Sequence, residues 1–301
     1  MRALLIVLWG VGLIGVWARA GEARLVLPDS PRVAFVGNTL VERDQEQGYF
    51  ETRLLAAFAD RAVEFRNLGW SGDTVRGEAR AGFGPPADGF NHLARHLAEL
   101  KPNLIFLNYG LNEAFAGDGG LAGYEADLNR LLDVLTKDGA RVVVFSIMQQ
   151  EGVGAPLPDP AGQNRNIQTY NAALAKAAAA RQGMTYVDLY DVPAEYAKAN
   201  GGRHFTSNEI HPTPDGCRFF GEAVMGRLGL PVAAWTDRLE RVRRLTVEKN
   251  RLYFHRWRPE NETYIFGFRK KEQGQNAVEI PQFDPLVAEK EGEIASVLKE
   301  K

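Results

Sequence analysis

The feature that most constrains the fold of this 301-residue chain is a regular alternation, from residue 32 onward, of short apolar runs with amphipathic segments. Each apolar run has the length and composition of a buried parallel strand. Strands that alternate with helices form a parallel sheet with helices on both faces. The sequence therefore predicts a three-layer α/β/α sandwich with a five-stranded parallel sheet. The expected strands are Val33–Val36, Ala62–Leu68, Leu104–Leu107, Arg141–Ile147 and Thr185–Leu189.

The segments between and after these runs carry apolar residues at helical spacing. The last of them begins with Pro214, which suits the first turn of a helix because no N–H is needed there. A Gly- and Pro-rich stretch at Gly152–Gln163 instead predicts a surface loop beside the carboxyl edge of the sheet. The expected helices are Tyr49–Ala62, Phe90–Leu100, Tyr124–Leu135, Tyr170–Arg181 and Pro214–Leu228.

The amino terminus has the pattern of a secretory leader. Residues 3–17 form an apolar run behind Arg2, and Ala18-Arg19-Ala20 follows as a cleavage site. This pattern predicts a signal peptide over residues 1–20 and places the mature protein in the periplasm or outside the cell. The other interpretation is an uncleaved membrane anchor, for which the run is shorter than the ~20 residues that a span needs. We expect no stable membrane span after the leader is removed.

Composition excludes several classes of function. The 36 basic residues against 38 acidic ones give a net charge of −2, which predicts no nucleic-acid partner. Cys217 is the only cysteine, so an internal disulfide and a multi-cysteine zinc site are excluded, and its apolar neighbours predict that it is buried. His92 and His96 stand four apart without a third ligand, and we interpret them as solvated residues on a helix. We expect neither a metal nor an organic cofactor.

Polar and glycine-rich sequences occur where the predicted strands end. Ligands bind α/β sheets of this kind outside the carboxyl ends of the strands. Because parallel strands present these ends at one edge, the polar sequences should meet there, and the edge is the expected active site. The four blocks are Gly37-Asn38-Thr39, Asn67–Thr74, Gly110–Glu113 and Asn208–Thr213.

In this order, the four blocks resemble those of the SGNH (GDSL-type) hydrolase family, over residues 32–230. The resemblance implies a flavodoxin-like sheet and a role for each matching residue. Thr39 stands at the position of the family's nucleophilic serine. Its N–H, the Gly72 N–H and the Asn112 amide would form the oxyanion hole. His211 stands at the position of the general base, and Asn208 at that of the aspartate that orients the base.

Two central positions depart from the family pattern. Thr39 replaces serine, and its β-methyl group stiffens χ1 and crowds the approach of a substrate. Asn208 replaces aspartate; its amide oxygen could accept a hydrogen bond from the His211 ring, but it cannot stabilise the imidazolium that forms during catalysis. In a variant of the mechanism, Glu42 or Glu113 assists the base in place of Asn208.

The resemblance implies an acyl esterase that hydrolyses carboxylic esters through an acyl-enzyme. Its substrate would be a small-molecule or glycan ester, and deacetylation of carbohydrate is one form of this activity. The retained Gly72, Asn112 and His211 favour the enzyme, because a pure binding module has less need of an oxyanion hole. Thr39 and Asn208 favour the alternative, a catalytically degenerate member that serves as a glycan- or protein-binding module.

Residues 235–301 form a basic, aromatic C-terminal extension. Basic residues crowd between Arg241 and Arg258 and are interleaved with aromatic ones such as Trp257. One interpretation is an extension that wraps the domain while arginine stems cover apolar surface. The other is an arm that binds an acidic glycan or a partner protein, with the aromatic rings as stacking surfaces. Alternating aromatic residues predict a strand over residues 264–268.

Overall fold

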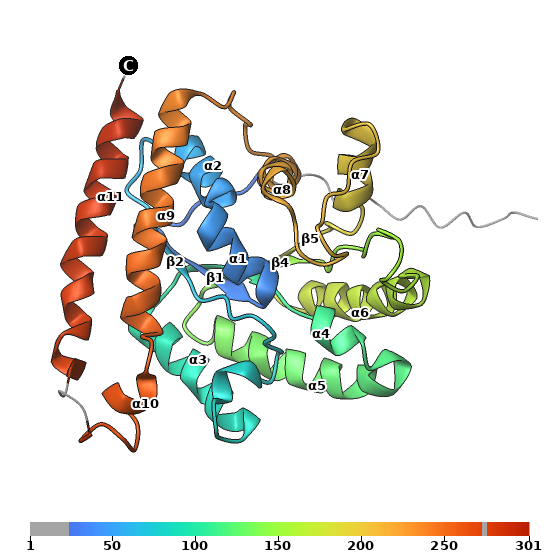
Figure 1. The fold of residues 1–301 in the computed structure, drawn as a ribbon, viewed down its shortest axis with the longest axis horizontal. Helices are drawn as coiled ribbons and strands as arrows, with labels where there is room; N and C mark the ends of the chain where they lie inside the picture. The colour runs from blue at the N-terminus through green and yellow to red at the C-terminus, as the bar shows by residue number, and fades with distance from the viewer. Residues whose placement is uncertain (1–23, 273–275, 301) are drawn as a thin grey trace, which may run out of the picture.

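A computed structural model describes residues 24–272 and 276–300, so the predicted leader lies outside the described residues. Its centre is one sheet of five parallel strands in the order β2-β1-β3-β4-β5, which confirms the predicted flavodoxin-like sheet (Figure 1). Within the described ranges, no helix has both the length and the apolar character to cross a membrane. The strands are β1 (Arg32–Gly37), β2 (Glu64–Asn67), β3 (Leu104–Asn108), β4 (Arg141–Phe145) and β5 (Met184–Val187).

The central strands are buried on both faces, as their apolar runs predict. Every residue of β3 is buried, and the register pairs Val33 of β1 with Leu104 of β3. Two apolar clusters, one on each face of the sheet, make up the core of the domain. The helices of the domain are α1 (Thr39–Gln47), α2 (Tyr49–Ala57), α3 (Pro86–Leu100), α4 (Leu111–Ala114), α5 (Gly117–Thr136), α6 (Ala161–Ala179), α7 (Val192–Ala199) and α8 (Pro214–Arg227).

The helices divide between the two faces of the sheet. Helices α3, α5 and α6 pack on one face, and α2, α7 and α8 pack on the other (Figure 1). This arrangement confirms the three-layer α/β/α architecture. Helix α6 begins at Ala161, so the predicted surface loop Gly152–Gln163 ends slightly earlier than expected.

The sequence pattern does not predict α1, which begins directly after β1. A Cβ atom at Gly37 would lie 2.4 Å from the Asn108 carbonyl oxygen of β3, so only glycine fits at this junction. Asn38 caps the helix, since its Oδ1 accepts the Leu40 N–H at 3.4 Å. The helix is mostly polar and lacks an apolar stripe, which is why periodicity does not reveal it.

The extension folds into α9 (Asp237–Trp257), α10 (Glu262–Ile265) and α11 (Phe283–Lys299). Helices α9 and α11 lie side by side at the β2 edge of the sheet, and α9 also contacts α1 and α2 (Figure 1). The strand predicted over residues 264–268 is wrong: this segment contains the end of α10 and a turn. Helix α9 packs against β2, the edge strand on the side of the extension, and so stands where a further strand would pair.

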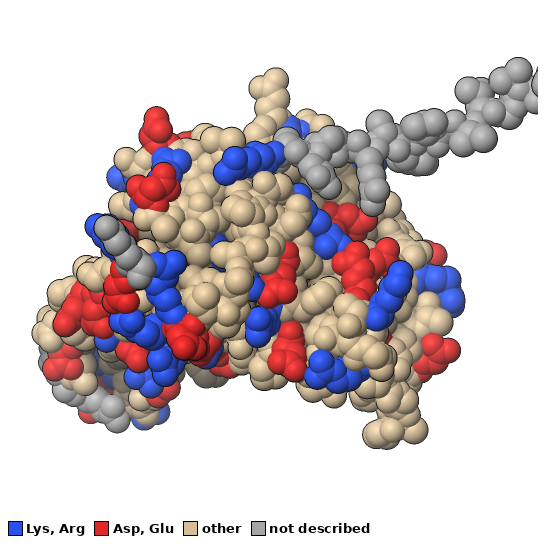
Figure 2. All heavy atoms as spheres, turned by 90° about the horizontal axis from the view of Figure 1, so that it is seen from above, with Lys and Arg blue, Asp and Glu red and all other residues tan. Residues whose placement is uncertain are grey.

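Many basic side chains of the extension are paired within the molecule, and Figure 2 shows basic and acidic side chains interspersed on the face that it presents. This mixture favours the interpretation of an extension that wraps the domain, and the binding of an acidic glycan or partner stays a prediction. The pairs include Arg241–Glu300, Arg243–Glu240, Lys249–Glu51, Arg256–Asp284 and Arg258–Glu42.

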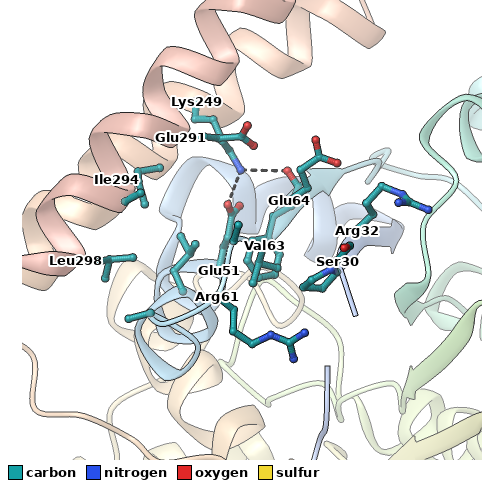
Figure 3. Close-up of a pocket in the computed structure, with 16 residues that line it drawn as sticks. Ser30, Arg32, Glu51, Arg61, Val63, Glu64, Lys249, Glu291, Ile294 and Leu298 are labelled. Carbon is teal, nitrogen blue, oxygen red and sulfur yellow. Dashed lines mark hydrogen bonds and ion pairs between the residues drawn. The ribbon is translucent and has the colours of Figure 1, made fainter. Parts of the chain in front are cut away.

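A cavity of about 530 Å³ lies where α9 and α11 meet the amino ends of β1 and β2 (Figure 3). Lys249 of α9 donates to Glu51 Oε1 and, at 3.2 Å, to the Phe65 carbonyl oxygen, while Asn250 donates to Glu51 Oε2 at 3.0 Å. Lys249 and Glu51 are only 1% and 3% exposed. A buried ion pair therefore fastens the extension to the domain.

Candidate active site

Three of the predicted site residues lie at the carboxyl ends of neighbouring strands. Thr39 is the first residue of α1, directly after β1. Gly72 lies in the segment that follows β2, and Asn112 lies in α4, just after β3. Because β2, β1 and β3 are adjacent in the sheet, these residues share one edge.

Gly72 lies in a tight turn whose geometry favours glycine. The Asp73 N–H donates to the Trp70 carbonyl oxygen at 3.1 Å, and Gly72, the third residue of this turn, has a φ of +75°. The turn presents the Gly72 N–H to Thr39, whose Oγ1 accepts it at 3.1 Å. The predicted nucleophile and one predicted oxyanion donor are therefore in direct contact.

Asn112 is held beside the same turn. Its Nδ2 donates to the Asp73 carbonyl oxygen at 2.8 Å, which uses one of the two amide N–H donors and leaves the other for a substrate oxygen. The buried Asp73 carboxylate accepts from Arg80 Nε at 2.5 Å and from the Tyr109 hydroxyl at 2.6 Å. In the described part of the chain, the Thr39 N–H has no acceptor. Thr39, Gly72 and Asn112 thus supply three N–H donors.

His211 lies on a loop before α8 that is anchored to the domain. Glu151 accepts the Phe205 N–H at 2.9 Å and the Thr206 N–H at 2.5 Å. Thr206 also pairs with Pro212 in an isolated β-bridge. Among residues 24–272 and 276–300, no hydrogen bond joins His211 to Thr39. The structure thus brings His211 to Asn208 but not into hydrogen-bond contact with Thr39, and the Asn208 amide oxygen does not accept from the ring as expected, because the His211 backbone N–H occupies it.

Asn208 determines which nitrogen of the His211 ring carries the proton. The backbone N–H of His211 can only donate, and it donates to Asn208 Oδ1 at 2.9 Å. The amide nitrogen of Asn208 therefore faces the ring, with Nδ2 3.0 Å from His211 Nδ1. Because Nδ2 can only donate, Nδ1 must accept, and the proton of the neutral ring lies on Nε2. An aspartate at this position would accept from both groups and favour the opposite tautomer.

The environment of His211 favours the neutral form of its ring. Burial lowers the pKa of His211, and the positive charge of Arg43 lowers it further. Arg43 is exposed and forms no hydrogen bond or ion pair with any described residue. Sequence analysis missed Arg43 as a neighbour of the base, because only the unpredicted helix α1 brings it there.

Glu42 and Glu113, the alternative partners for the base, are both engaged elsewhere. Glu42 Oε2 accepts the Ser71 N–H and pairs with Arg258 Nη1 at 3.0 Å. Glu113 Oε1 accepts the Val75 N–H at 2.8 Å. Among the hydrogen bonds and ion pairs of the described residues, none joins either carboxylate to His211.

We expect Glu113→Gln to stabilise the fold at neutral and alkaline pH. Although Glu113 as a residue is half-buried, its Oε2 is shielded from solvent and has no partner among the described residues. Burial raises the pKa of Glu113 from 4.5 to about 7. Between these values the unfolded chain loses the proton while the folded chain keeps it, so wild-type stability falls as pH rises through this window.

Urea denaturation of both proteins between pH 4.5 and 8.5 tests this expectation. The advantage of the glutamine variant should grow up to about pH 7 and then level off. An advantage that is the same at every pH would contradict it.

A small hollow of about 30 Å³ lies beside Thr39 and is lined in part by Asn38 and Glu209. These residues are 2% and 6% exposed, and Asn38 Nδ2 and Glu209 Oε1 have no hydrogen-bond partner within the described residues. Glu209 has a φ of +70°, a strained conformation for a residue other than glycine. Sequence analysis missed Glu209, since nothing in the sequence reveals its backbone conformation.

The structure corrects the interpretation of His92 and His96 as solvated residues. Their ring centroids are 4.5 Å apart, and Trp257 of the extension packs edge-on against His96 at 5.2 Å. Burial lowers the pKa of His96 to about 3.

Cys217 is buried, as predicted, and burial raises its pKa to about 12. The described residues contain no group of three or more His, Cys, Asp or Glu side chains placed to hold a metal ion.

Solved structures similar to this chain include other α/β proteins of low sequence identity. A protein from Parabacteroides merdae, described as a GDSL-like lipase, is 16% identical with a TM-score of 0.54, over 68% of this chain and 99% of its own. A variant of an acetyl xylan esterase from Geobacillus stearothermophilus is also 16% identical, with a TM-score of 0.54, over 69% of this chain and 99% of its own. At this identity the likeness demonstrates the fold.

Sequence comparison identifies the family. No curated protein matches the chain. The model of the GDSL-like lipase/acylhydrolase family matches residues 33–219, which include all the predicted site residues. The chain therefore belongs to the GDSL-like lipase/acylhydrolase family.

Proposed function

We propose that this protein is an exported esterase that hydrolyses carboxylic esters through an acyl-enzyme on Thr39. The observation that carries the proposal is the contact between the Gly72 N–H and Thr39 Oγ1 at 3.1 Å. It places an oxyanion donor against the atom that would attack, with the Asn112 amide held beside the same turn. Export rests on the predicted leader at residues 1–20.

In the proposed reaction, His211 Nε2 removes the proton of the Thr39 hydroxyl as Oγ1 attacks the acyl carbonyl. The N–H groups of Thr39, Gly72 and Asn112 stabilise the negative oxygen of the tetrahedral intermediate. The intermediate collapses, the C–O bond to the alcohol breaks, and the protonated imidazole returns its proton to the leaving oxygen. Water, deprotonated by the same ring, then attacks the acyl carbon. The bond from that carbon to Thr39 Oγ1 breaks, the ring returns the proton to Oγ1, and the acid is released.

Asn208 makes this a slow reaction. The ring must present an unprotonated Nε2 to Thr39, whereas the amide nitrogen of Asn208 favours the tautomer that is protonated there. The reaction therefore proceeds through the minor tautomer, and the imidazolium lacks a carboxylate to stabilise it.

A small acyl group on a carbohydrate is the substrate class that we propose. The hollow of about 30 Å³ beside Thr39 has room for little more than a methyl group, which suits acetyl better than a long acyl chain. An acetyl xylan esterase among the similar structures supports the same substrate class.

The second candidate is a catalytically degenerate member that binds a glycan or a protein without hydrolysis. One observation favours it: Asn208 Nδ2 lies 3.0 Å from His211 Nδ1. This contact favours the tautomer in which Nε2 already carries a proton, and in that form the ring cannot act as the base. The two candidates differ in whether a folded protein turns over an ester.

We expect purified residues 21–301 to hydrolyse a short-chain aryl acetate, and Thr39→Ala and His211→Ala each to reduce turnover to the buffer rate. Thr39→Ser should keep turnover, because it retains the nucleophilic hydroxyl and removes the crowding methyl group. Steady-state kinetics, with circular dichroism to verify folding, provide the measurement.

The other outcomes separate the alternatives. Turnover that survives Thr39→Ala but requires His211 would identify water as the attacking group. If folded wild-type protein shows no turnover above buffer, the esterase proposal fails and glycan binding by the second candidate becomes the next measurement.

A further inference from the structure

The C-terminal extension reaches the turn that carries the oxyanion donor. Arg258, at the end of α9, places its guanidinium carbon 3.6 Å from the centroid of the Trp70 ring. Its Nη1 also pairs with Glu42 Oε2 at 3.0 Å. The side chains of Arg258 and Glu42 are 25% and 19% exposed, so this ion pair is partly shielded from solvent.

Glu42 connects Arg258 to the candidate active site. The same Oε2 atom accepts the N–H of Ser71, the residue before Gly72. Glu42 also lies one turn along α1 from Thr39. One carboxylate thus joins the helix that begins at Thr39 to the turn that presents Gly72, and Arg258 fixes the orientation of that carboxylate.

A second residue of the extension holds the same turn. Trp257 packs edge-on against Trp70 with ring centroids 5.8 Å apart. Within the domain itself, backbone hydrogen bonds tie the turn, from the Trp70 N–H to Gly37 (3.0 Å) and from the Asp73 N–H to Trp70 (3.1 Å). Side chains of the domain also hold its two ends: Arg80 pairs with the buried Asp73, and His92 packs edge-on against the Trp70 ring. Ser71 and Gly72 are exposed, so little else packs on them.

The extension is an addition to the family domain. The family model ends at residue 219, before α9 begins at Asp237. The two similar structures above are covered over 99% of their own length but only 68–69% of this chain.

We propose that Arg258 is a positioning residue for the oxyanion turn, the turn Trp70–Asp73 that carries the Gly72 N–H. The extension would then contribute to catalysis as well as pack against the domain. Arg258 acts through Glu42 and Trp70 to keep the Gly72 N–H directed at Thr39. Its kinetic consequence rests on the proposed esterase function. Loss of one oxyanion donor lowers kcat by about 10²–10³, and because Arg258→Ala loosens the donor without removing it, we expect a fall in kcat of about 10- to 100-fold with KM little changed.

The experiment compares Arg258→Ala with the matched control Arg256→Ala. Arg256 lies in the same last turn of α9 but pairs with Asp284 of α11, at 2.9 Å, away from the oxyanion turn. For each protein, as residues 21–301, we would measure kcat and KM for an aryl acetate and hydrogen–deuterium exchange of peptides covering residues 69–75. Added methylguanidinium ion, which can fill the vacated place, should partly restore kcat in Arg258→Ala.

The expected result is lower kcat and faster exchange of these peptides in Arg258→Ala, and neither change in Arg256→Ala. If Arg258→Ala does not fold, Arg258→Lys takes its place; it keeps the charge but loses the planar stacking on Trp70, so a smaller change of the same sign is expected. Equal exchange and equal kcat in the folded Arg258 and Arg256 variants would overturn the proposal.

The exchange measurement separates this proposal from the proposed function. If wild-type protein hydrolyses nothing, the esterase proposal fails, yet faster exchange in the Arg258 variant alone would still support positioning of the turn. If the wild type is active and the Arg258 variant loses kcat without any change in exchange, positioning of the turn is wrong while the esterase proposal stands.

Discussion

Asn208→Asp is expected to raise kcat for ester hydrolysis by about 10²–10⁴. In wild-type protein, Asn208 Oδ1 is held by the His211 backbone N–H, and the amide nitrogen faces Nδ1 of the ring. An aspartate keeps the first hydrogen bond and replaces the donor at the second position with an acceptor. The ring can then carry its proton on Nδ1 and present a free Nε2 to Thr39. The opposite change in a Ser-His-Asp protease costs about 10⁴ in kcat, which sets the scale.

The pH dependence of the same variant provides a second measurement. In wild-type protein, burial and Arg43 lower the pKa of His211. A carboxylate beside Nδ1 favours the imidazolium, so the acidic limb of the pH–rate profile should move to higher pH in Asn208→Asp. Asn208→Ala is the control, because it removes the hydrogen bond to the backbone without supplying a carboxylate. An aspartate variant no faster than wild type would mean that the tautomer of His211 does not limit the reaction.

Lys249→Met is expected to lower the free energy of unfolding by about 3–5 kcal/mol. Lys249 reaches from α9 to Glu51 of α2, and the two are 1% and 3% exposed. Removing the ammonium group leaves the Glu51 carboxylate buried, and among the described residues the Asn250 amide is then its only side-chain donor. An unpaired buried charge costs more than the lost attraction itself. Urea denaturation monitored by circular dichroism is the measurement.

The reason for this loss can be separated from a simple loss of packing. Replacing both Glu51 and Lys249 with methionine should restore much of the stability, since no buried charge remains. Arg241→Met, at the exposed pair with Glu300, is the matched control and should leave the denaturation midpoint unchanged. If the double replacement restored no stability, loss of packing would be the cause of the deficit.

The sequence predicts the central sheet because its signal is local. Runs such as Leu104–Leu107 are wholly apolar, since a parallel strand covered on both faces meets no water. The polar blocks that follow the strands share one edge because parallel strands end on the same side of a sheet. For this reason the sequence alone predicts that Thr39, Gly72 and Asn112 lie near one another.

The sequence does not predict the parts whose partners lie far along the chain. Helix α1 is polar because polar and basic groups of the extension cover it; Arg243, for example, donates to the Gln47 carbonyl oxygen at 2.8 Å across 196 positions. Helical spacing alone predicts that His96 is solvated, but Trp257 packs on it. Local periodicity carries no information on such contacts.

By itself, the sequence determined the layered fold, the edge at which the site lies and the two departures from the family pattern, because each depends on residue type and short-range order. Only the tertiary structure decided the orientation of the Asn208 amide, which depends on a hydrogen bond to the His211 backbone. Only the tertiary structure also shows that Arg258 contacts Trp70 and Glu42. The path of the extension depends on long-range packing and on the buried Lys249–Glu51 ion pair, which no local pattern predicts.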